Sequence, residues 1–374
     1  MNRRIVVHFG AGALGRGLVV PLLRESGCEV VLADTDEALN RALNESRGYV
    51  LTFSDEAPEN RRKTVGILEA LSPLGDREKL AQYLRESSVV TTSVRRENLP
   101  HVARFLAKTW GSGSADAGPK IVICCENIEH AGRHFKELLM REAKTAAQKA
   151  RLAAVRVPDT VVDRICAADW PAGTDVVSEK FYECAVDAGV VDGTGIRLIP
   201  SVRHIGMHFA RKRCLMNAYA DAIAFIAIGE GKTYLHEAAA SAEINRTVAP
   251  YLSLVMTALE LEYGFDRSEL IEWRETYRKR LCNAGIPRRL DTVARNLWPK
   301  LAPGERFVRP LIRLLERGVE IGEGAAFLAV LIRAGAGPRG GSADGGHIKE
   351  KLRELWCESP GGLKLYEQVA ALLP

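Results

Sequence analysis

The chain has 374 residues and a mass of 41.0 kDa, with 47% hydrophobic and 26% charged residues. A single core tends to divide beyond roughly 250–300 residues, so this length predicts two domains, and the ordinary composition excludes a disordered or collagen-like chain. The net charge is +5, but Lys and Arg are interleaved with Asp and Glu rather than gathered in blocks. No nucleic-acid partner is therefore expected.

The sequence also gives no sign of export or of a membrane span. The apolar run that follows the basic start breaks at His8, and the longest candidate span, residues 218–228, is interrupted by Asp221 and falls short of about 18 residues. The eight cysteines are irregularly spaced, without a CxxC pair. This pattern favours reduced, mostly buried thiols, a cytoplasmic location and no metal site.

The first half of the chain alternates β-branched runs with amphipathic stretches, which is typical of βαβ units and a parallel sheet. Residues 178–186 and 196–200 are strand-like and are expected to extend that sheet. Residues 111–119 are expected to form a surface loop, because the alternation continues after them. The predicted strands are residues 5–9, 29–33, 89–93 and 121–125, and the first predicted helices are residues 17–26 and 36–44.

From about His204 onward the apolar residues repeat with a helical period and almost no alternating pattern remains. A glycine-rich stretch, residues 335–346, is expected to be a mobile loop before a last helix near Ile348. We therefore predict an α/β domain over residues 1–203 and an all-α domain over residues 204–374. Its other predicted helices are residues 211–228, 235–263, 268–281, 307–316 and 322–334.

The strongest local signal is a glycine-rich turn between the first predicted strand and helix. Its sequence is Gly10-Ala11-Gly12-Ala13-Leu14-Gly15. In a dinucleotide-binding fingerprint the first glycine permits a tight turn, the second lets the backbone approach a pyrophosphate, and the third lets helix and strand pack closely. The strand and helix on either side favour this interpretation over a turn without a ligand. The first domain is thus predicted to be a doubly wound, Rossmann-type domain that binds a dinucleotide through these six residues.

An acidic residue, Asp34, ends the second predicted strand. Its carboxylate can accept hydrogen bonds from ribose hydroxyls and would repel a 2′-phosphate, which favours NAD over NADP unless a nearby arginine reverses the preference. Alternatively, Asp34 could cap the following helix, a role that is equally open to Asp36.

Polar residues also follow the next two predicted strands, in Thr91-Thr92-Ser93 and in Cys124-Cys125-Glu126-Asn127. Ligands of open parallel sheets bind at the carboxyl ends of strands, so we expect Thr92 and Asn127 at the cofactor site. The Asn127 amide could donate to a substrate oxygen or could satisfy the backbone of its own turn. Position alone leaves both roles open.

Several segments, in order, resemble the mannitol-1-phosphate 5-dehydrogenase family. They are residues 8–17, 125–127, 162–165, 181–187 and 304–311, and the resemblance extends to about Ala334. It implies an NAD-dependent oxidoreductase that interconverts a sugar alcohol or its phosphate, such as mannitol 1-phosphate, with the ketose, such as fructose 6-phosphate. The expected partner is this small molecule, and the expected state is a monomer or weak homodimer.

That family belongs to the polyol-specific long-chain dehydrogenases, whose signature is a lysine, an asparagine five residues later and a histidine three further on. Lys212 and Asn217 match the first two positions, whereas Ala220 stands at the third. By resemblance, Lys212 is the general acid/base. Asn127 and Asn217 would stabilise charge on the reacting oxygen, and Asp163 would position the substrate. The missing histidine bears more on recognition of substrate hydroxyls than on proton transfer.

Physical chemistry is compatible with a catalytic lysine here, since oxidation of a carbinol needs a base for the hydroxyl proton. Desolvation and the neighbouring Arg211 and Arg213 would lower the pKa of Lys212 toward neutrality. Without the family pattern, three solvated basic residues on a helix would be the plainer interpretation. If the segment is an α-helix, residues 212, 216 and 220 share one face with Asn217 at its edge.

Four residues near Ala220 in sequence could take over from the absent histidine: His204, His208, Tyr219 and Asp221. Two other functions stay open. One is a hexuronate reductase, because Arg95, Arg96 or Arg309 could face either a phosphate or a carboxylate. The other is a non-catalytic NAD-binding protein that lost turnover together with the third signature residue.

Overall fold

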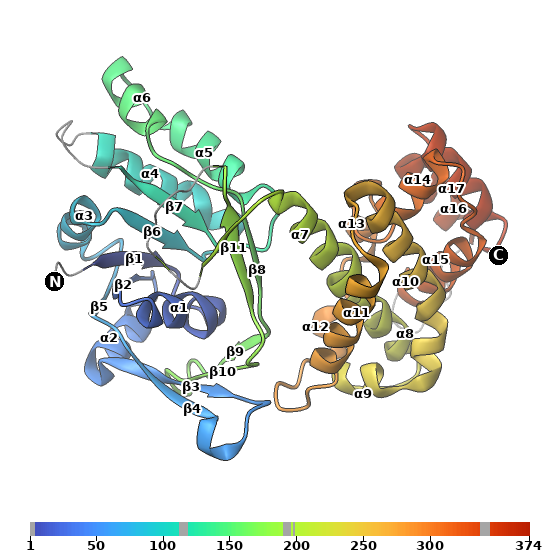
Figure 1. Ribbon diagram of the computed structural model, residues 1–374, viewed down its shortest axis with the longest axis horizontal. Coiled ribbons are helices and arrows are strands. Elements are labelled where there is room, and N and C mark those ends of the chain that lie inside the picture. The colour runs from blue at the N-terminus through green and yellow to red at the C-terminus, as the bar shows by residue number, and fades with distance from the viewer. Residues whose placement is uncertain (1–3, 112–118, 190–195, 197–198, 337–344) are drawn as a thin grey trace. The chain divides into compact units, whose positions relative to one another are not determined.

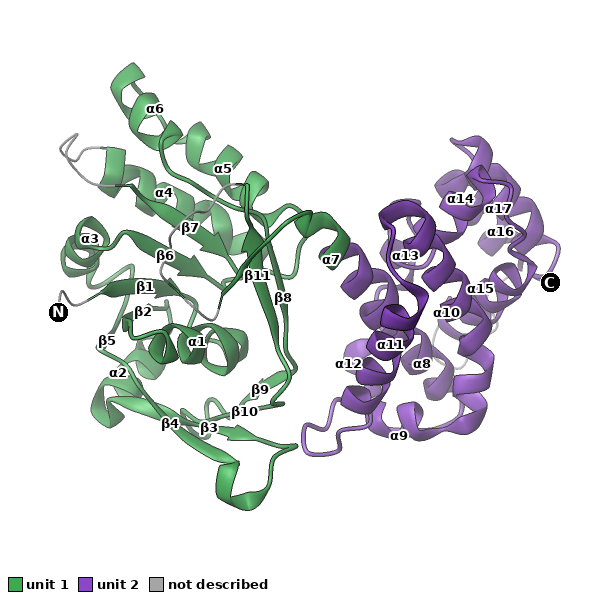
Figure 2. Ribbon diagram, in the orientation of Figure 1, with its two compact units in different colours: residues 1–208 green, residues 209–374 purple. Residues whose placement is uncertain are grey.

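The computed structural model describes the chain except for residues 1–3, 112–118, 190–195, 197–198 and 337–344. It divides into two compact units, Met1–His208 and Phe209–Pro374 (Figure 2). The boundary expected from the sequence, between residues 203 and 204, marks where the helical pattern begins. The units divide later, inside helix α7 (Ile205–Arg211).

The first unit is built on a five-stranded parallel sheet in the order β5-β2-β1-β6-β7 (Figure 1). Nearly every residue of these strands is buried, because helices cover both faces, and the strand sequences are therefore predominantly apolar. The strands are β1 (Ile5–Phe9), β2 (Glu29–Ala33), β5 (Glu69–Leu71), β6 (Val89–Thr92) and β7 (Ile121–Cys124). The predicted Rossmann-type α/β fold is confirmed.

Each face of this sheet has its own hydrophobic core. Val6 and Val7 are neighbours in β1 but belong to different cores, as expected when successive side chains of a strand point to opposite faces. One core includes Leu18 and Leu23, and the other includes Trp110. The helices of this unit are η1 (Gly15–Val19), α1 (Val20–Glu25), α2 (Glu37–Ser46), η2 (Pro58–Asn60), α3 (Arg77–Glu86), η3 (Arg96–Asn98), α4 (Leu99–Gly111), α5 (Ala131–Arg141) and α6 (Ala146–Ala153).

Two smaller sheets complete the first unit. One has the order β4-β3-β10-β9 and the other β12-β11-β8. The expectation that residues 178–186 extend the parallel sheet is therefore wrong, because an apolar strand does not itself show which sheet it joins. Residues 196–200 lie partly outside the described residues. The strands are β3 (Gly48–Phe53), β4 (Arg62–Gly66), β8 (Thr160–Asp163), β9 (Cys166–Ala168), β10 (Val176–Ser178), β11 (Glu183–Asp187) and β12 (Ser201–Val202).

The second unit is helical throughout the part that the structure describes, which confirms the predicted all-α region. The helices after α7 are η4 (Lys212–Asn217), α8 (Ala218–Gly229), α9 (Leu235–Ala240), α10 (Ala242–Tyr263), α11 (Arg267–Leu281), α12 (Leu290–Val293), α13 (Leu297–Lys300), α14 (Arg309–Glu316), α15 (Gly322–Gly335), α16 (Gly345–Trp356) and α17 (Pro360–Ala370). The helix near Ile348 is not the last one, since α17 follows it. Most of the predicted loop at residues 335–346, like that at residues 111–119, lies outside the described residues.

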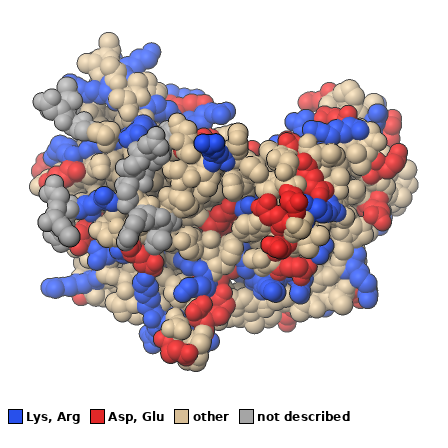
Figure 3. Space-filling view, viewed as in Figure 1, with Lys and Arg blue, Asp and Glu red and all other residues tan. Residues whose placement is uncertain are grey.

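The structure also describes the length of the apolar helices and the distribution of charged side chains on one face. Among the described residues, no helix is long and apolar enough to cross a membrane. On the face that Figure 3 shows, Lys and Arg are interspersed with Asp and Glu instead of forming one extended basic surface.

Candidate functional site

The glycine-rich turn after β1 is shaped by close backbone contacts. Gly10 has a φ of +101°, and a Cβ atom there would lie 2.6 Å from the Ser93 carbonyl oxygen. A Cβ atom at Gly15 would lie 2.2 Å from the Gly10 carbonyl oxygen, whereas one at Gly12 would meet nothing within 4 Å. Packing within the chain thus requires Gly10 and Gly15 and leaves open space at Gly12, where the fingerprint brings a pyrophosphate close to the backbone.

Asp34 connects this turn to the end of β2. Its Oδ2 accepts a hydrogen bond from the Ala11 N–H at 2.7 Å, and its Oδ1 accepts one from the Asp36 N–H at 3.0 Å. Asp36, not Asp34, caps α2, since it accepts from the Leu39 N–H at 2.9 Å. The carboxylate of Asp34 is half-buried and each oxygen keeps further acceptor capacity. A bond from a ribose hydroxyl therefore fits, and this role stays a prediction.

Two buried basic side chains support the turn from inside the unit. Arg16 Nε donates to the Ala11 carbonyl at 2.6 Å. His8 Nδ1 lies 2.7 Å from Thr91 Oγ1, and His8 Nε2 lies 3.0 Å from Ser93 Oγ. Burial lowers the pKa of His8 to about 4, so the imidazole is neutral at pH 7. The sequence analysis gave His8 no role, although a polar residue within an apolar strand is the signal that could have pointed to it.

Glu126 joins the carboxyl ends of β6 and β7. Its Oε2 accepts from Thr92 Oγ1 at 2.8 Å and its Oε1 accepts from the Val94 N–H at 3.0 Å. Burial raises the pKa of this carboxyl to about 7. The Thr92 hydroxyl thus bonds to protein here, while the next residue, Asn127, is exposed at the strand end. The cofactor roles of Thr92 and Asn127 stay predictions, and sequence alone could not have shown that Glu126 is buried.

Asp163 lies at the end of β8, in the three-stranded sheet and not in the parallel one. Only 8% of its surface is exposed, and it stands opposite Glu183 of β11 in the antiparallel register. The next residue, Arg164, donates to the carbonyls of Phe181 and Gly17 at 3.1 and 2.9 Å. The segment is therefore firmly held. Its part in substrate positioning stays a prediction.

Lys212 and Asn217 are the first and last residues of η4, which is a π-helical turn and not part of a regular α-helix. The Ala218 N–H bonds to the Arg213 carbonyl, five residues back. In an α-helix residues five apart would be rotated by about 140°, whereas i to i+5 bonding places them about one turn apart on the same side. The π turn thus changes the geometry assumed for an α-helix and would bring Asn217 nearer to the side of Lys212, while the catalytic roles of both residues stay predictions. Lys212 is only 4% exposed, which excludes a solvated basic face.

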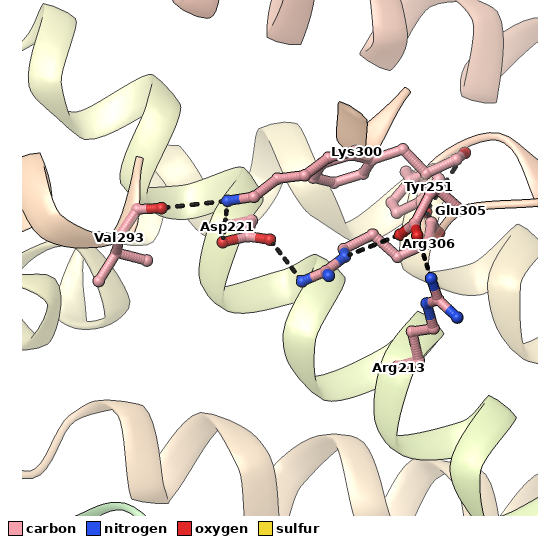
Figure 4. A network of polar contacts seen from close by, with 8 residues as sticks. Arg213, Asp221, Tyr251, Val293, Lys300, Glu305 and Arg306 are labelled. Atoms are coloured by element: carbon pink, nitrogen blue, oxygen red, sulfur yellow. Dashed lines mark hydrogen bonds and ion pairs between the residues drawn. The ribbon is translucent and has the colours of Figure 1, made fainter. Parts of the chain in front are cut away.

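Both arginines beside Lys212 are anchored within the second unit. The Arg211 guanidinium lies 3.8 Å from the centre of the Trp273 ring. Arg213 forms an ion pair with Glu305, which itself lies in a larger polar network (Figure 4). Their positive charges are thus engaged by partners far away in sequence, which the sequence could not show.

Asp221, one candidate replacement for the missing histidine, belongs to the same network. Asp221 pairs with Lys300 and with Arg306, each at 2.8 Å (Figure 4). Tyr219 donates its hydroxyl to Asn245. Both side chains are buried and engaged in contacts of their own, and a role for either in place of the histidine stays a prediction.

The two histidine candidates lie at the end of the first unit. His208 Nδ1 lies 3.4 Å from a carboxylate oxygen of Glu183, so it pairs with β11. His204 precedes α7 with a φ of +55°. Among the described residues no group of three His, Cys, Asp or Glu side chains could hold a metal ion.

Residues 4–198 match the family of the mannitol dehydrogenase Rossmann domain. The mannitol-1-phosphate 5-dehydrogenases of Paenarthrobacter aurescens and Neurospora crassa are 31% and 30% identical to this chain. The alignments cover 84% and 83% of the chain and 82% and 80% of those proteins.

Solved structures share the fold over almost the whole chain. The Pseudomonas fluorescens mannitol 2-dehydrogenase, solved as a ternary complex with NAD and D-mannitol, has a TM-score of 0.76 at 18% identity and covers 99% of this chain and 91% of its own. A substrate-free D-sorbitol dehydrogenase has a TM-score of 0.78 at 16% identity, with 99% and 92% covered. The family match and the identity to these relatives together show that the chain belongs to the mannitol dehydrogenase family of oxidoreductases.

Proposed function

We propose that this protein is an NAD-dependent dehydrogenase that interconverts a sugar alcohol or its phosphate, such as mannitol 1-phosphate, with the ketose, such as fructose 6-phosphate. The observation that carries the proposal is the burial of Lys212 at the start of the π turn η4, whose i to i+5 bonding would bring Asn217 to the same side. The names of the relatives, mannitol-1-phosphate 5-dehydrogenases, support the phosphorylated substrate.

The first unit supplies the residues that would hold NAD. The open space at Gly12 suits the diphosphate, and the half-buried carboxylate of Asp34 suits the adenosine ribose. Thr92 and Asn127, at the carboxyl ends of β6 and β7, would adjoin the nicotinamide half. NAD, when bound, supplies the acceptor or donor for the hydride.

The second unit supplies the proton-transfer group. Lys212 would take the carbinol proton during oxidation and return it during reduction, which requires a neutral amine for part of the cycle. Asn217 and Asn127 would polarise the reacting oxygen by donating amide N–H bonds, and Asp163 would position the substrate.

Ala220 departs from the family signature at the point where the expected histidine would contact substrate hydroxyls. Tyr219 and Asp221 are occupied elsewhere, so we infer that no side chain of η4 or early α8 replaces it directly. The chain would then recognise the rest of its substrate through a group other than the hydroxyls that the histidine would contact, such as a phosphate. Arg309 is the weaker candidate for binding that phosphate, because its guanidinium already donates to Glu262 at 2.8 Å and to the Tyr263 hydroxyl at 2.6 Å.

A substrate screen tests the proposal. NADH oxidation is followed with fructose 6-phosphate, other ketose phosphates, free ketoses and keto-uronates, and we expect turnover with a ketose phosphate. Turnover with keto-uronates alone would establish a hexuronate reductase instead. NADH binding without turnover of any compound would indicate a non-catalytic homologue, and both results would overturn the proposed reaction.

A further inference from the structure

The segment between β6 and η3 contains a strained arginine. Arg95 has φ +69° and ψ +159°. This region is strained for a residue with a Cβ atom, and it is occupied almost only by glycine. Such strain persists only where the surroundings enforce it, and it gathers at ligand-binding sites.

Hydrogen bonds hold the backbone of Val94 and Arg95 in place. The Val94 N–H donates to the buried carboxyl of Glu126 at 3.0 Å, and the Val94 carbonyl accepts from Asn98 Nδ2 at 2.8 Å. The Asn98 N–H also donates to the Arg95 carbonyl at 3.2 Å. Three hydrogen bonds therefore enforce the conformation, and a glycine at position 95 would satisfy all of them without strain.

This segment adjoins the glycine-rich turn. Ser93 Oγ donates to the Gly10 carbonyl at 3.1 Å, and the Ser93 N–H donates to the Phe9 carbonyl at 2.8 Å. Arg95 thus follows by two residues the contact that closes the turn around Gly10. It belongs to the same edge of the sheet as Gly12, whose missing side chain leaves open space.

Arg95 and Arg96 are both exposed. In the described part of the chain neither guanidinium lies within 4.0 Å of a carboxylate, unlike Arg213 or Arg309, which form ion pairs. A guanidinium presents paired N–H donors that match the oxygens of a phosphate group. A charged side chain that has no partner among the described residues, on a strained and rigidly held backbone, is suited to a ligand anion.

We propose that Arg95 binds a phosphate group at this edge of the sheet, and that its strained backbone holds the guanidinium in place for that purpose. The phosphate belongs either to the diphosphate of the dinucleotide or to a sugar phosphate, and the second source rests on the function proposed above. Arg96, one residue later and inside η3, has ordinary helical geometry and the same charge. It is therefore the matched control.

The test compares Arg95→Gly, Arg95→Lys and Arg96→Gly in the full chain. Arg95→Gly relieves the strain, so its Tm should rise by about 2–4 °C. The same variant should weaken phosphate binding at least about tenfold, while Arg95→Lys, which keeps a positive charge, should lose less. Arg96→Gly should raise neither the Tm nor a dissociation constant. A purely structural role for Arg95 does not predict higher stability together with weaker binding.

Two binding titrations identify the source of the phosphate, and neither needs turnover. NADH is titrated by fluorescence, and fructose 6-phosphate is titrated calorimetrically into protein saturated with NAD⁺, with fructose as the control. A tenfold loss in the first titration assigns Arg95 to the diphosphate, and a loss in the second alone assigns it to the sugar phosphate. If Arg95→Gly changes neither affinity, or lowers the Tm, the proposal is wrong. If the substrate screen finds no turnover, the proposed function is wrong, but the NADH titration still tests whether Arg95 binds the diphosphate.

Discussion

Two π-helical turns, η1 in the first unit and η4 in the second, are held in place by opposite means. In η1 the backbone itself packs closely, so that a Cβ atom at Gly15 or at Gly17 would lie within 2.6 Å of other atoms of the unit. In η4 there is no glycine, and the side chains of Arg211, just before the turn, and Arg213, within it, are anchored to Trp273 and Glu305. Such turns are rare and often adjoin functional sites.

The difference predicts how each turn responds to mutation. A turn defined by backbone contacts should not tolerate an added methyl group where the backbone is crowded, since main-chain atoms cannot move aside cheaply. A turn defined by side-chain anchors should tolerate small changes of volume but not the loss of a partner charge. The residues that carry chemistry also differ, because η1 adjoins a binding turn whereas η4 contains the proposed acid/base.

The largest expected effect concerns that acid/base. Lys212→Ala should lower kcat by at least about 10²-fold, the scale of a lost general acid/base, while NADH affinity stays within about twofold. Lys212→Arg should be equally impaired, because a guanidinium keeps its proton at neutral pH. Steady-state kinetics with the substrate found in the screen, and NADH titration, measure both quantities. Turnover retained in either variant would remove Lys212 from the mechanism.

Next in size are two pH effects of opposite sign within the first unit. Burial lowers the pKa of His8 from 6.5 to about 4, so its contribution to stability is present above pH 6.5 and lost as the pH falls toward 4. Burial raises the pKa of Glu126 from 4.5 to about 7, so its contribution is present below pH 4.5 and lost as the pH rises toward 7. Each effect is on the order of 3 kcal/mol, and in the unmodified protein they largely cancel between pH 4.5 and 6.5.

Single variants should separate the two. Relative to the unmodified protein, the free energy of unfolding of Glu126→Gln should rise with pH between 4.5 and 7, and that of His8→Gln should fall between pH 4 and 6.5. Chemical denaturation across this range gives both differences. Parallel pH profiles for the two variants would contradict the assigned shifts.

Breaking an anchor of η4 should have an intermediate effect. Glu305→Gln removes the charge that faces Arg213, and because both side chains are largely buried we expect a loss of about 1–3 kcal/mol in the free energy of unfolding. The matched control is Glu316→Gln, whose partner Arg313 and own side chain are 45% and 41% exposed, so that about 0–1 kcal/mol is expected. Equal losses in the two variants would show that η4 does not depend on its side-chain anchors.

The same contrast explains which features could be predicted from the sequence. The strands at residues 5–9 and 29–33 coincide with β1 and β2, because apolar runs bounded by glycines and polar residues are local signals. The partners of β10 and β11 could not be predicted, since pairing depends on residues far away in the chain. For the site, glycine spacing indicated the turn around Gly12, whereas the burial of Glu126 and the π geometry of η4 arise only from tertiary packing.

The smallest expected effect on stability, that of Gly12→Ala, separates binding from folding in the glycine-rich turn. Gly12→Ala adds a methyl group where no described atom beyond its chain neighbours lies within 4 Å, so stability should be unchanged while the Kd for NADH rises about tenfold. Gly15→Ala places the same methyl group 2.2 Å from the Gly10 carbonyl oxygen, so the chain itself should lose about 1–3 kcal/mol. Thermal unfolding and NADH titration on both variants make the comparison. If Gly12→Ala binds NADH normally, the open space at Gly12 is not where the diphosphate lies, and the turn's glycines serve packing alone.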